Sequence, residues 1–257
     1  MKINGVATQW RYPEMSEREM SRSLQDVAAK LTEKMRDELK PMKFDATDEE
    51  IDQTERSLLD YVESLIAPII GSLSSVALAI YKFNSKQWLR IARNAGGKKN
   101  QAVMLLALIG PTAAESWYSG QYNLWRSQVT TSIRKFAANM VTDFTDKLRA
   151  ASGQGKSKDF VVELAKERFG IYRSWAKNRA SGIVGTWNSR LMRQRIKDAG
   201  VSYYFWRGVM DLREREKHVR WEGKRIAVDS DHVFPGEEYN CRCWAVPSFT
   251  TSNGKVS

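Results

Sequence analysis

The chain has 257 residues, of which 42% are hydrophobic and 28% are charged. This composition excludes wholesale disorder, and the length allows one large domain or two small ones. The net charge of +11 favours a partner that carries phosphate, acidic side chains or anionic lipid. Two cysteines separated by one residue exclude a disulfide-rich secreted domain. Because the N-terminus lacks a continuous apolar stretch, we expect no signal peptide and assembly in the cytoplasm.

Two helices are predicted at the N-terminus, each with a start signal. The pattern Ser16 to Glu19 is a capping box, and apolar residues at helical spacing follow it up to Pro41. A second capping box, Thr47 to Glu50, opens the next helix. Proline lacks a backbone N–H and obstructs the preceding turn, so we expect Pro68 to end or bend that helix.

Two uncharged stretches, 64–81 and 100–114, are joined by a basic segment without acidic residues. A membrane hairpin with a basic connector is one interpretation, because the first stretch reaches the minimum spanning length. Pro68, Gly71 and Gly110 interrupt both stretches and favour a buried helix pair instead. Membrane contact is therefore the alternative, and not the main expectation.

A long helix is predicted from Thr112 to about Arg149. The small residues of Ala151–Ser157 are typical of a linker. We therefore place a domain boundary there, between a helical bundle domain at 1–150 and a second domain at 151–257.

The second domain begins with helices and ends with short strands. Helices are expected at 160–169, closed by Gly170, and at 175–196, closed by Gly200. β-branched and aromatic residues predict strands within 201–209, 224–228 and 243–246. The predicted fold class is mainly α, with a helical bundle in the N-terminal part and, at the C-terminus, a small α+β unit of basic helices and a few short strands.

Both histidines and both cysteines fall between positions 218 and 243. Zinc prefers four nitrogen or sulfur ligands, so a structural zinc site is one interpretation of this clustering. The alternative is that the cysteines are small buried hydrophobes and that the first histidine donates to a carboxylate such as Asp211. The candidate zinc ligands are His218, His232, Cys241 and Cys243.

Catalysis is not expected. The zinc-hydrolase and deaminase spacings are absent, and Glu237 and Glu238 beside Pro235 are interpreted as a solvated turn. A Cys/His pair alone does not define a thiol protease. We therefore predict that the protein is not an enzyme.

Basic residues are concentrated in the second domain: positions 147–225 contain 20 Lys or Arg against 8 Asp or Glu. Such an excess binds the phosphate backbone of double-stranded DNA without sequence preference, and an acidic protein surface would be recognised equally well. The residues predicted to contact nucleic acid or a portal protein are Arg190, Arg193, Arg195, Lys197, Arg207 and Arg215.

The C-terminal motif carries a family resemblance. Asp211-x-Arg213, a following His218, a turn glycine and a closing Asn-Cys-Arg-Cys-x-x-x-Pro together resemble the signature of phage head morphogenesis proteins, the Mu F-like minor head proteins. The likeness is clearest over 211–247 and weaker upstream, over 178–195. Many relatives carry a cysteine pair just after Asp-x-Arg, where this chain has 214–217, so a four-cysteine site is excluded. The motif residues, for which we expect a structural role, are Asp211, Arg213, Gly223, Asn240, Arg242 and Pro247.

The resemblance implies a minor capsid protein in the virion of a tailed phage, located at the portal vertex. It implies a role in head morphogenesis and in DNA packaging or ejection, with the portal and other capsid proteins as partners. Self-association of the N-terminal helices is a further expectation. Two alternatives stay open: a membrane-active ejected protein that uses 64–114, and a zinc-dependent nuclease or hydrolase carried in the head.

Overall fold

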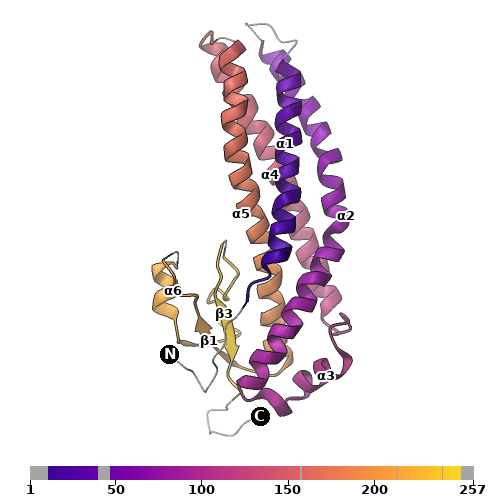
Figure 1. Cartoon of the computed structure of the whole chain (residues 1–257), viewed down its shortest axis with the longest axis vertical. Helices are drawn as coiled ribbons and strands as arrows, with labels where there is room; N and C mark the ends of the chain where they lie inside the picture. Colours follow the sequence, from indigo (N-terminus) through magenta and orange to yellow (C-terminus); the bar gives the residue numbers. More distant parts are fainter. Residues whose placement is uncertain (1–10, 40–46, 157, 213, 239, 250–257) are drawn as a thin grey trace. The chain divides into compact units, whose positions relative to one another are not determined.

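The computed structural model describes residues 11–39, 47–156, 158–212, 214–238 and 240–249. Within them the fold is mainly helical with one small antiparallel sheet, which confirms the predicted fold class (Figure 1). The elements are α1 (Glu14–Leu39), α2 (Asp48–Asn94), the 3-10 helix η1 (Gly97–Lys99), α3 (Gln101–Ile109), α4 (Tyr118–Gly153), α5 (Lys158–Asp198), β1 (Tyr203–Arg207), α6 (Glu216–Trp221), β2 (Arg225–Ala227) and β3 (Trp244–Pro247).

The predicted capping box at the start of α2 is confirmed. The backbone N–H of Thr47 donates to the Glu50 carboxylate at 2.8 Å, and the N–H of Glu50 donates to the Thr47 hydroxyl at 3.3 Å. Helix α1 begins at Glu14, directly after Pro13, which is two residues before the predicted cap at Ser16.

Neither Pro68, predicted to end or bend its helix, nor Gly170, predicted to close one, ends a helix. Helix α2 continues through Pro68, and α5 continues through Gly170. Both residues are exposed, so water can solvate the Ser64 carbonyl that Pro68 leaves without its helical partner. Packing of the flanking buried turns outweighs the unfavourable contribution of each breaker, about 3 kcal/mol for proline and about 1 kcal/mol for glycine.

The chain forms two compact units. Unit 1 comprises Met1–Ser16, Ser75–Trp125 and Ser181–Ser257, and unit 2 comprises Glu17–Ser74 and Arg126–Ala180. Helices α2, α4 and α5 each contribute residues to both units, so these bounds differ from a single boundary after residue 150. The predicted linker coincides with the end of α4 and a turn at Gly155, whose φ is +59°.

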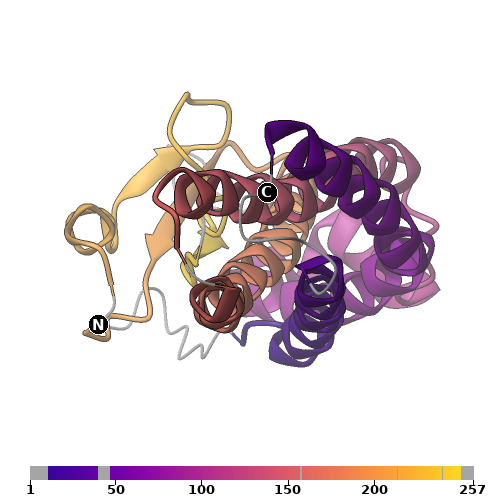
Figure 2. The same ribbon diagram turned by 90° about the horizontal axis from the view of Figure 1, so that it is seen from above.

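Unit 2 consists of helical segments that lie side by side, from α1, α2, α4 and α5 (Figures 1 and 2). Its core is built from the apolar stripes that the sequence predicts, including Leu24 and Phe136. A polar network ties α4 to α5: the guanidinium of Arg168 donates to both oxygens of Asp143 at 2.6 and 2.7 Å. Burial raises the pKa of Tyr172, and the hydrogen bond from its hydroxyl to Asp143 raises it further.

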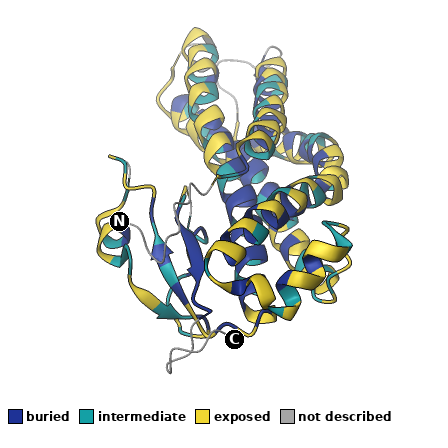
Figure 3. Cartoon of the chain, turned by 60° about the horizontal axis from the view of Figure 1, so that its bottom comes forward, coloured by how far each residue is buried: buried dark blue, intermediate teal, exposed yellow. Residues whose placement is uncertain are grey.

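The sheet of unit 1 has the order β2-β1-β3, with β1 antiparallel to both neighbours. In the register, Tyr204 of β1 lies opposite Ile226 on one side and Pro247 on the other. All four residues of β3 are buried, which Figure 3 shows as a dark strand. The sheet packs on the C-terminal part of α2, on α3 and on the end of α5 through Trp88, Val103 and Ile196.

The end of α5 is fixed by a Schellman motif, as predicted from Gly200. Gly200 has a φ of +66°, which favours glycine, and its N–H donates to the Lys197 carbonyl at 2.9 Å. The N–H of Val201 donates to the Ile196 carbonyl at 3.1 Å. This cap turns the chain directly into β1 and thereby positions the sheet.

Helix α2 contains an 18-residue window with a mean hydropathy of 1.8, long and apolar enough to cross a membrane by length and composition. A third of that window, 33%, is buried in the protein. Over 64–81 the bulky residues Ile66, Leu73 and Ile80 are buried, whereas most exposed positions hold serine, alanine, glycine or proline. Core helices of soluble proteins have the same character.

Candidate functional site

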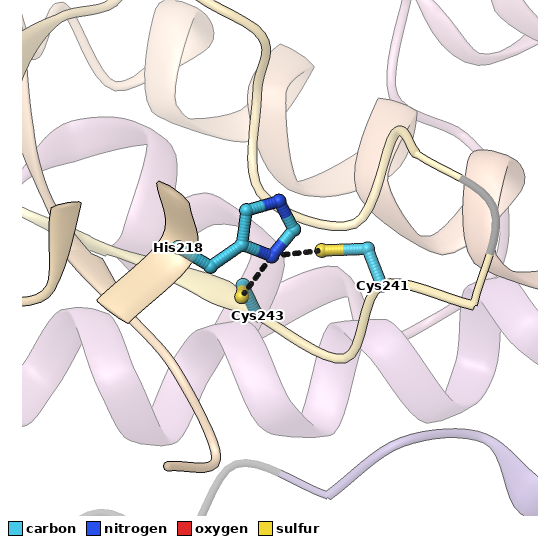
Figure 4. Close-up of side chains that lie close together, drawn as sticks. All are labelled: His218, Cys241 and Cys243. Carbon is cyan, nitrogen blue, oxygen red and sulfur yellow. Dashed lines mark hydrogen bonds between the residues drawn. The ribbon is translucent and has the colours of Figure 1, made fainter. Parts of the chain in front are cut away.

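Three of the four predicted zinc ligands lie together in unit 1. His218 comes from α6, and Cys241 and Cys243 from the segment that leads into β3 (Figure 4). The His218 Nδ1 atom is 3.4 Å from Cys243 Sγ and 3.8 Å from Cys241 Sγ, and all three ligand atoms lie within 4.8 Å of one another. His218, Cys241 and Cys243 are 1%, 6% and 4% exposed, respectively, so the cluster is closed to bulk water.

His232 does not join this group. Its Nδ1 atom lies 2.8 Å from the Val233 carbonyl oxygen, and its ring packs edge-on against Trp221 with the centroids 4.3 Å apart. Trp206 completes the aromatic contacts around both histidines. His232 is therefore held by aromatic packing. Its proximity in sequence to the other candidate ligands did not indicate this position.

Two glutamates contact His218 instead of Asp211. Glu214 Oε1 lies 3.1 Å from Nδ1, and Glu238 Oε2 lies 2.9 Å from Nε2. The interpretation of Glu238 as part of a solvated turn is wrong, because it also pairs with Arg215 at 3.0 Å and with Lys217. Burial opposes ionisation of Glu238, but the hydrogen bonds from Lys217 and His218 outweigh burial and lower its pKa. Glu237 is also engaged, accepting the Phe234 N–H at 2.9 Å.

The pKa values of the two thiols are shifted in opposite directions. A hydrogen bond from Cys243 lowers the pKa of Cys241 to about 6, although burial acts in the opposite direction. The same bond raises the pKa of Cys243. The backbone N–H of Gly236 also donates to Cys241 Sγ at 3.4 Å. The site therefore favours a thiolate at Cys241, the form in which cysteine binds metal ions.

The remaining motif residues close the loops around this cluster. Arg242 points away from the two cysteines and donates to Asp211 at 2.6 Å. Gly223 and Asn240 have φ angles of +74° and +57°, which place each at a left-handed turn. Pro247 pairs with Tyr204 in the sheet, and Arg213 lies outside the described residues.

Arg195, predicted to contact nucleic acid, is a core residue. It is 1% exposed and donates to Ser85 Oγ at 2.7 Å and to Glu115 Oε2 at 3.0 Å, as well as to Asn84. Burial raises the pKa of Tyr81 to about 12, and the hydrogen bond from Tyr81 to the same glutamate adds to this effect. Arg195 therefore stabilises the interior of unit 1 and does not reach a polyanion in this structure.

The other five residues of the predicted basic set have polar partners. Four pair with carboxylates, at 3.2, 2.6, 3.0 and 3.0 Å, and the fifth reaches a glutamine at 3.4 Å. The pairs are Arg193–Glu237, Lys197–Asp229, Arg207–Glu222, Arg215–Glu238 and Arg190–Gln121. Their charge is thus largely compensated within the protein.

A second basic surface lies on α2, which we call the α2 basic stripe: Lys82, Lys86, Arg90 and Arg93. All four are exposed, and their spacing of four, four and three residues places them on one face of the helix. Lys82, Lys86 and Arg93 take part in none of the ion pairs found among the described residues, and no acidic residue occurs between positions 64 and 114. The sequence shows a basic segment without acidic residues. Only the helical spacing of its lysines and arginines indicates that they form one surface.

Comparison with known families agrees with the resemblance seen in the motif. Residues 142–246 match the family model described as Phage Mu protein F like protein. This confirms the resemblance to the Mu F-like phage head morphogenesis proteins over that segment. The matched segment contains the His218, Cys241 and Cys243 cluster and the Asp211–Arg242 ion pair.

A relative in Haemophilus influenzae strain Rd, described as an uncharacterized protein, is 34% identical over 65 residues. The alignment covers 23% of this chain and 14% of the relative, so the chain spans only a small part of that protein's length. No solved structure matches the chain.

Proposed function

We propose that the protein is a minor head protein of a tailed phage, which sits at the portal vertex and acts in head morphogenesis and in DNA packaging or ejection. The observation that carries this proposal is the match of 142–246 to the Mu F-like family, because that segment contains the cluster and the ion pair that order the C-terminal unit. The α+β unit would dock on the portal or another capsid protein.

The test is the protein content of assembled particles. We expect mass spectrometry of purified heads to find the protein in few copies and together with the portal. Heads assembled without it should show reduced infectivity or an altered DNA content. Particles that assemble, fill and infect normally in its absence would contradict the proposal.

Contact with the packaged DNA is assigned to the α2 basic stripe. Its four cations sit on one helix face without acidic neighbours in the sequence, whereas the predicted set is paired with carboxylates. Cations that replace counterions on DNA give binding that weakens steeply with salt. Phosphate contacts of this kind would suit non-specific contact with double-stranded DNA.

Replacing Lys82, Lys86, Arg90 and Arg93 by glutamine is expected to weaken duplex binding by the full chain. The slope of log K against log salt should fall by about 0.9 for each phosphate that the variant no longer neutralises, or about 3 to 4 in all. Fluorescence anisotropy with a labelled duplex over a salt series measures this slope.

A matched control removes four exposed cations of unit 2, namely Arg126, Lys135, Lys147 and Lys177, and changes the net charge equally. The control variant should keep most of the slope of log K against log salt. If the slope falls equally in both variants, DNA binding depends on the net charge of the protein, and the assignment to the α2 basic stripe is wrong.

A membrane-active ejected protein is a second candidate, and the apolar window of α2 is the observation that favours it. Since Ile66, Leu73 and Ile80 in this part of α2 are buried, we expect the full chain to stay at the bottom of the gradient in liposome flotation. Flotation with neutral liposomes at high salt would favour the membrane candidate instead.

A further inference from the structure

We propose that Glu214, His218, Cys241 and Cys243 bind a structural zinc ion, with Glu238 as the residue that orients His218. This set keeps three of the ligands predicted from sequence and replaces His232 by a carboxylate. The inference does not depend on a role in phage heads.

The distances fit a tetrahedral site. With zinc bonds of about 2.0 to 2.3 Å, neighbouring ligand atoms lie about 3.3 to 3.8 Å apart. His218 Nδ1 is 3.4 Å from Cys243 Sγ and 3.8 Å from Cys241 Sγ. The ligand atoms of His218, Cys241 and Cys243 therefore lie at distances close to those of a zinc site.

Glu214 is the carboxylate that we assign as the fourth ligand, because it contacts two of the other three ligands. Its Oε1 atom is 3.1 Å from His218 Nδ1 and 3.3 Å from Cys243 Sγ. Its other oxygen, Oε2, accepts the backbone N–H of Val209 at 3.1 Å, which orients the carboxylate toward the cluster. The Glu214 side chain is only 6% exposed.

The hydrogen-bonding roles of His218 give an independent argument. Glu238 Oε2 lies 2.9 Å from Nε2, a geometry that suits the tautomer in which Nε2 donates to this carboxylate. In a neutral ring Nδ1 then presents a lone pair to two sulfurs and to the Glu214 oxygen. A zinc ion among these atoms would take the place of the thiol protons, and a carboxylate that fixes the outer nitrogen is the usual support for a zinc-bound histidine.

The ligand types select the metal and its role. Thiolates and imidazole favour zinc over magnesium or calcium, which prefer oxygen ligands. Four protein ligands in a buried cluster leave no open position for water, which indicates a structural site and not a catalytic one. The ion would join the segment around α6 to the segment before β3.

The first experiment measures metal in the full-length protein purified without chelator. We expect about one zinc ion per chain, and a Co²⁺-substituted protein should show thiolate-to-cobalt charge transfer and the visible bands of tetrahedral cobalt. Removal of zinc should lower the melting temperature, and added ZnCl₂ should restore it.

Variants distinguish the two ligand sets. Cys241→Ser and Glu214→Gln should lose zinc or bind it at least tenfold more weakly, whereas His232→Ala should retain it. The assignment of the fourth ligand would be overturned if Glu214→Gln retained zinc and His232→Ala lost it. If a cysteine variant fails to fold, the cobalt spectrum of the wild-type chain still decides whether thiolates bind the metal.

Three results would overturn the site as a whole or its role. One is a stable protein that is free of metal and gives no cobalt spectrum. Another is a metal-free His218 whose two ring nitrogens are both protonated by ¹⁵N NMR, because an imidazolium between Glu214 and Glu238 would then explain the geometry. The third is a zinc-dependent nuclease activity that His218→Ala abolishes while the fold is kept, which would make the site catalytic.

Discussion

Replacing Arg195 by methionine is expected to lower the free energy of unfolding by about 3 to 5 kcal/mol, because it leaves a buried carboxylate without its counter-charge. Glu115, whose side chain is 10% exposed, accepts two hydrogen bonds from the guanidinium, at 3.0 and 3.3 Å. Asn84 and Ser85 would lose donors in the same interior. Methionine fills a similar volume, so the loss reports mainly on the polar network.

Urea denaturation of the full chain measures the change, with Lys197→Met in the same helix as the control. Lys197 pairs with Asp229 at 2.6 Å, but the two side chains are 41% and 82% exposed. Such a surface pair contributes about 0 to 1 kcal/mol. Combining Arg195→Met with Glu115→Leu should recover part of the lost stability. If Arg195→Met lowers the free energy of unfolding no more than Lys197→Met does, the burial of Arg195 is energetically unimportant.

Truncation of Trp187 to alanine is expected to cost about 3 to 5 kcal/mol of stability, the usual range for a large buried aromatic side chain. Trp187 is fully buried, and its indole N–H donates to the Ala77 carbonyl at 2.9 Å. Its ring lies 5.2 Å from that of Trp125 and 5.8 Å from that of Tyr118. The variant thus removes both a core filler and a hydrogen bond between α5 and α2.

The variant Trp187→Phe separates these two contributions. It keeps most of the apolar volume but removes the hydrogen bond from the indole to the Ala77 carbonyl, which should cost about 0.5 to 1.5 kcal/mol. Leu124→Ala, at a residue that is 50% exposed, serves as the surface control and should change stability by less than about 0.5 kcal/mol. A Trp187→Ala protein as stable as the Leu124→Ala protein would contradict the packing of this core.

Much of the fold was predictable because its signals are local. The capping box at Thr47 and the C-terminal cap at Gly200 depend on residues a few positions apart, and both form as predicted. The strands were predicted from aromatic and β-branched composition, and all three form within one residue of the predicted ranges. Pro68 and Gly170 do not end their helices, because their local effect is outweighed by packing along the whole helix.

The site was predictable only in part, because it depends on tertiary geometry. Cys241 and Cys243 are close in sequence and meet His218, but the turns between 228 and 236 turn His232 toward the Trp221 ring. Glu214 stands four residues before His218, a spacing that does bring side chains together, so a signal existed. For Arg195 the overlooked signal was its place on the same helical face as Trp187 and Leu191, both fully buried.

Phe249 lies on Gly97, where an added Cβ would stand 2.4 Å from the phenylalanine ring. The contact joins positions 152 residues apart, and β3, which precedes it, is fully buried against residues of α2 and α5. A nascent chain cannot close the core of unit 1 on the ribosome before position 249 has emerged. Copies interrupted during translation before this point would keep that interior exposed to proteases and chaperones.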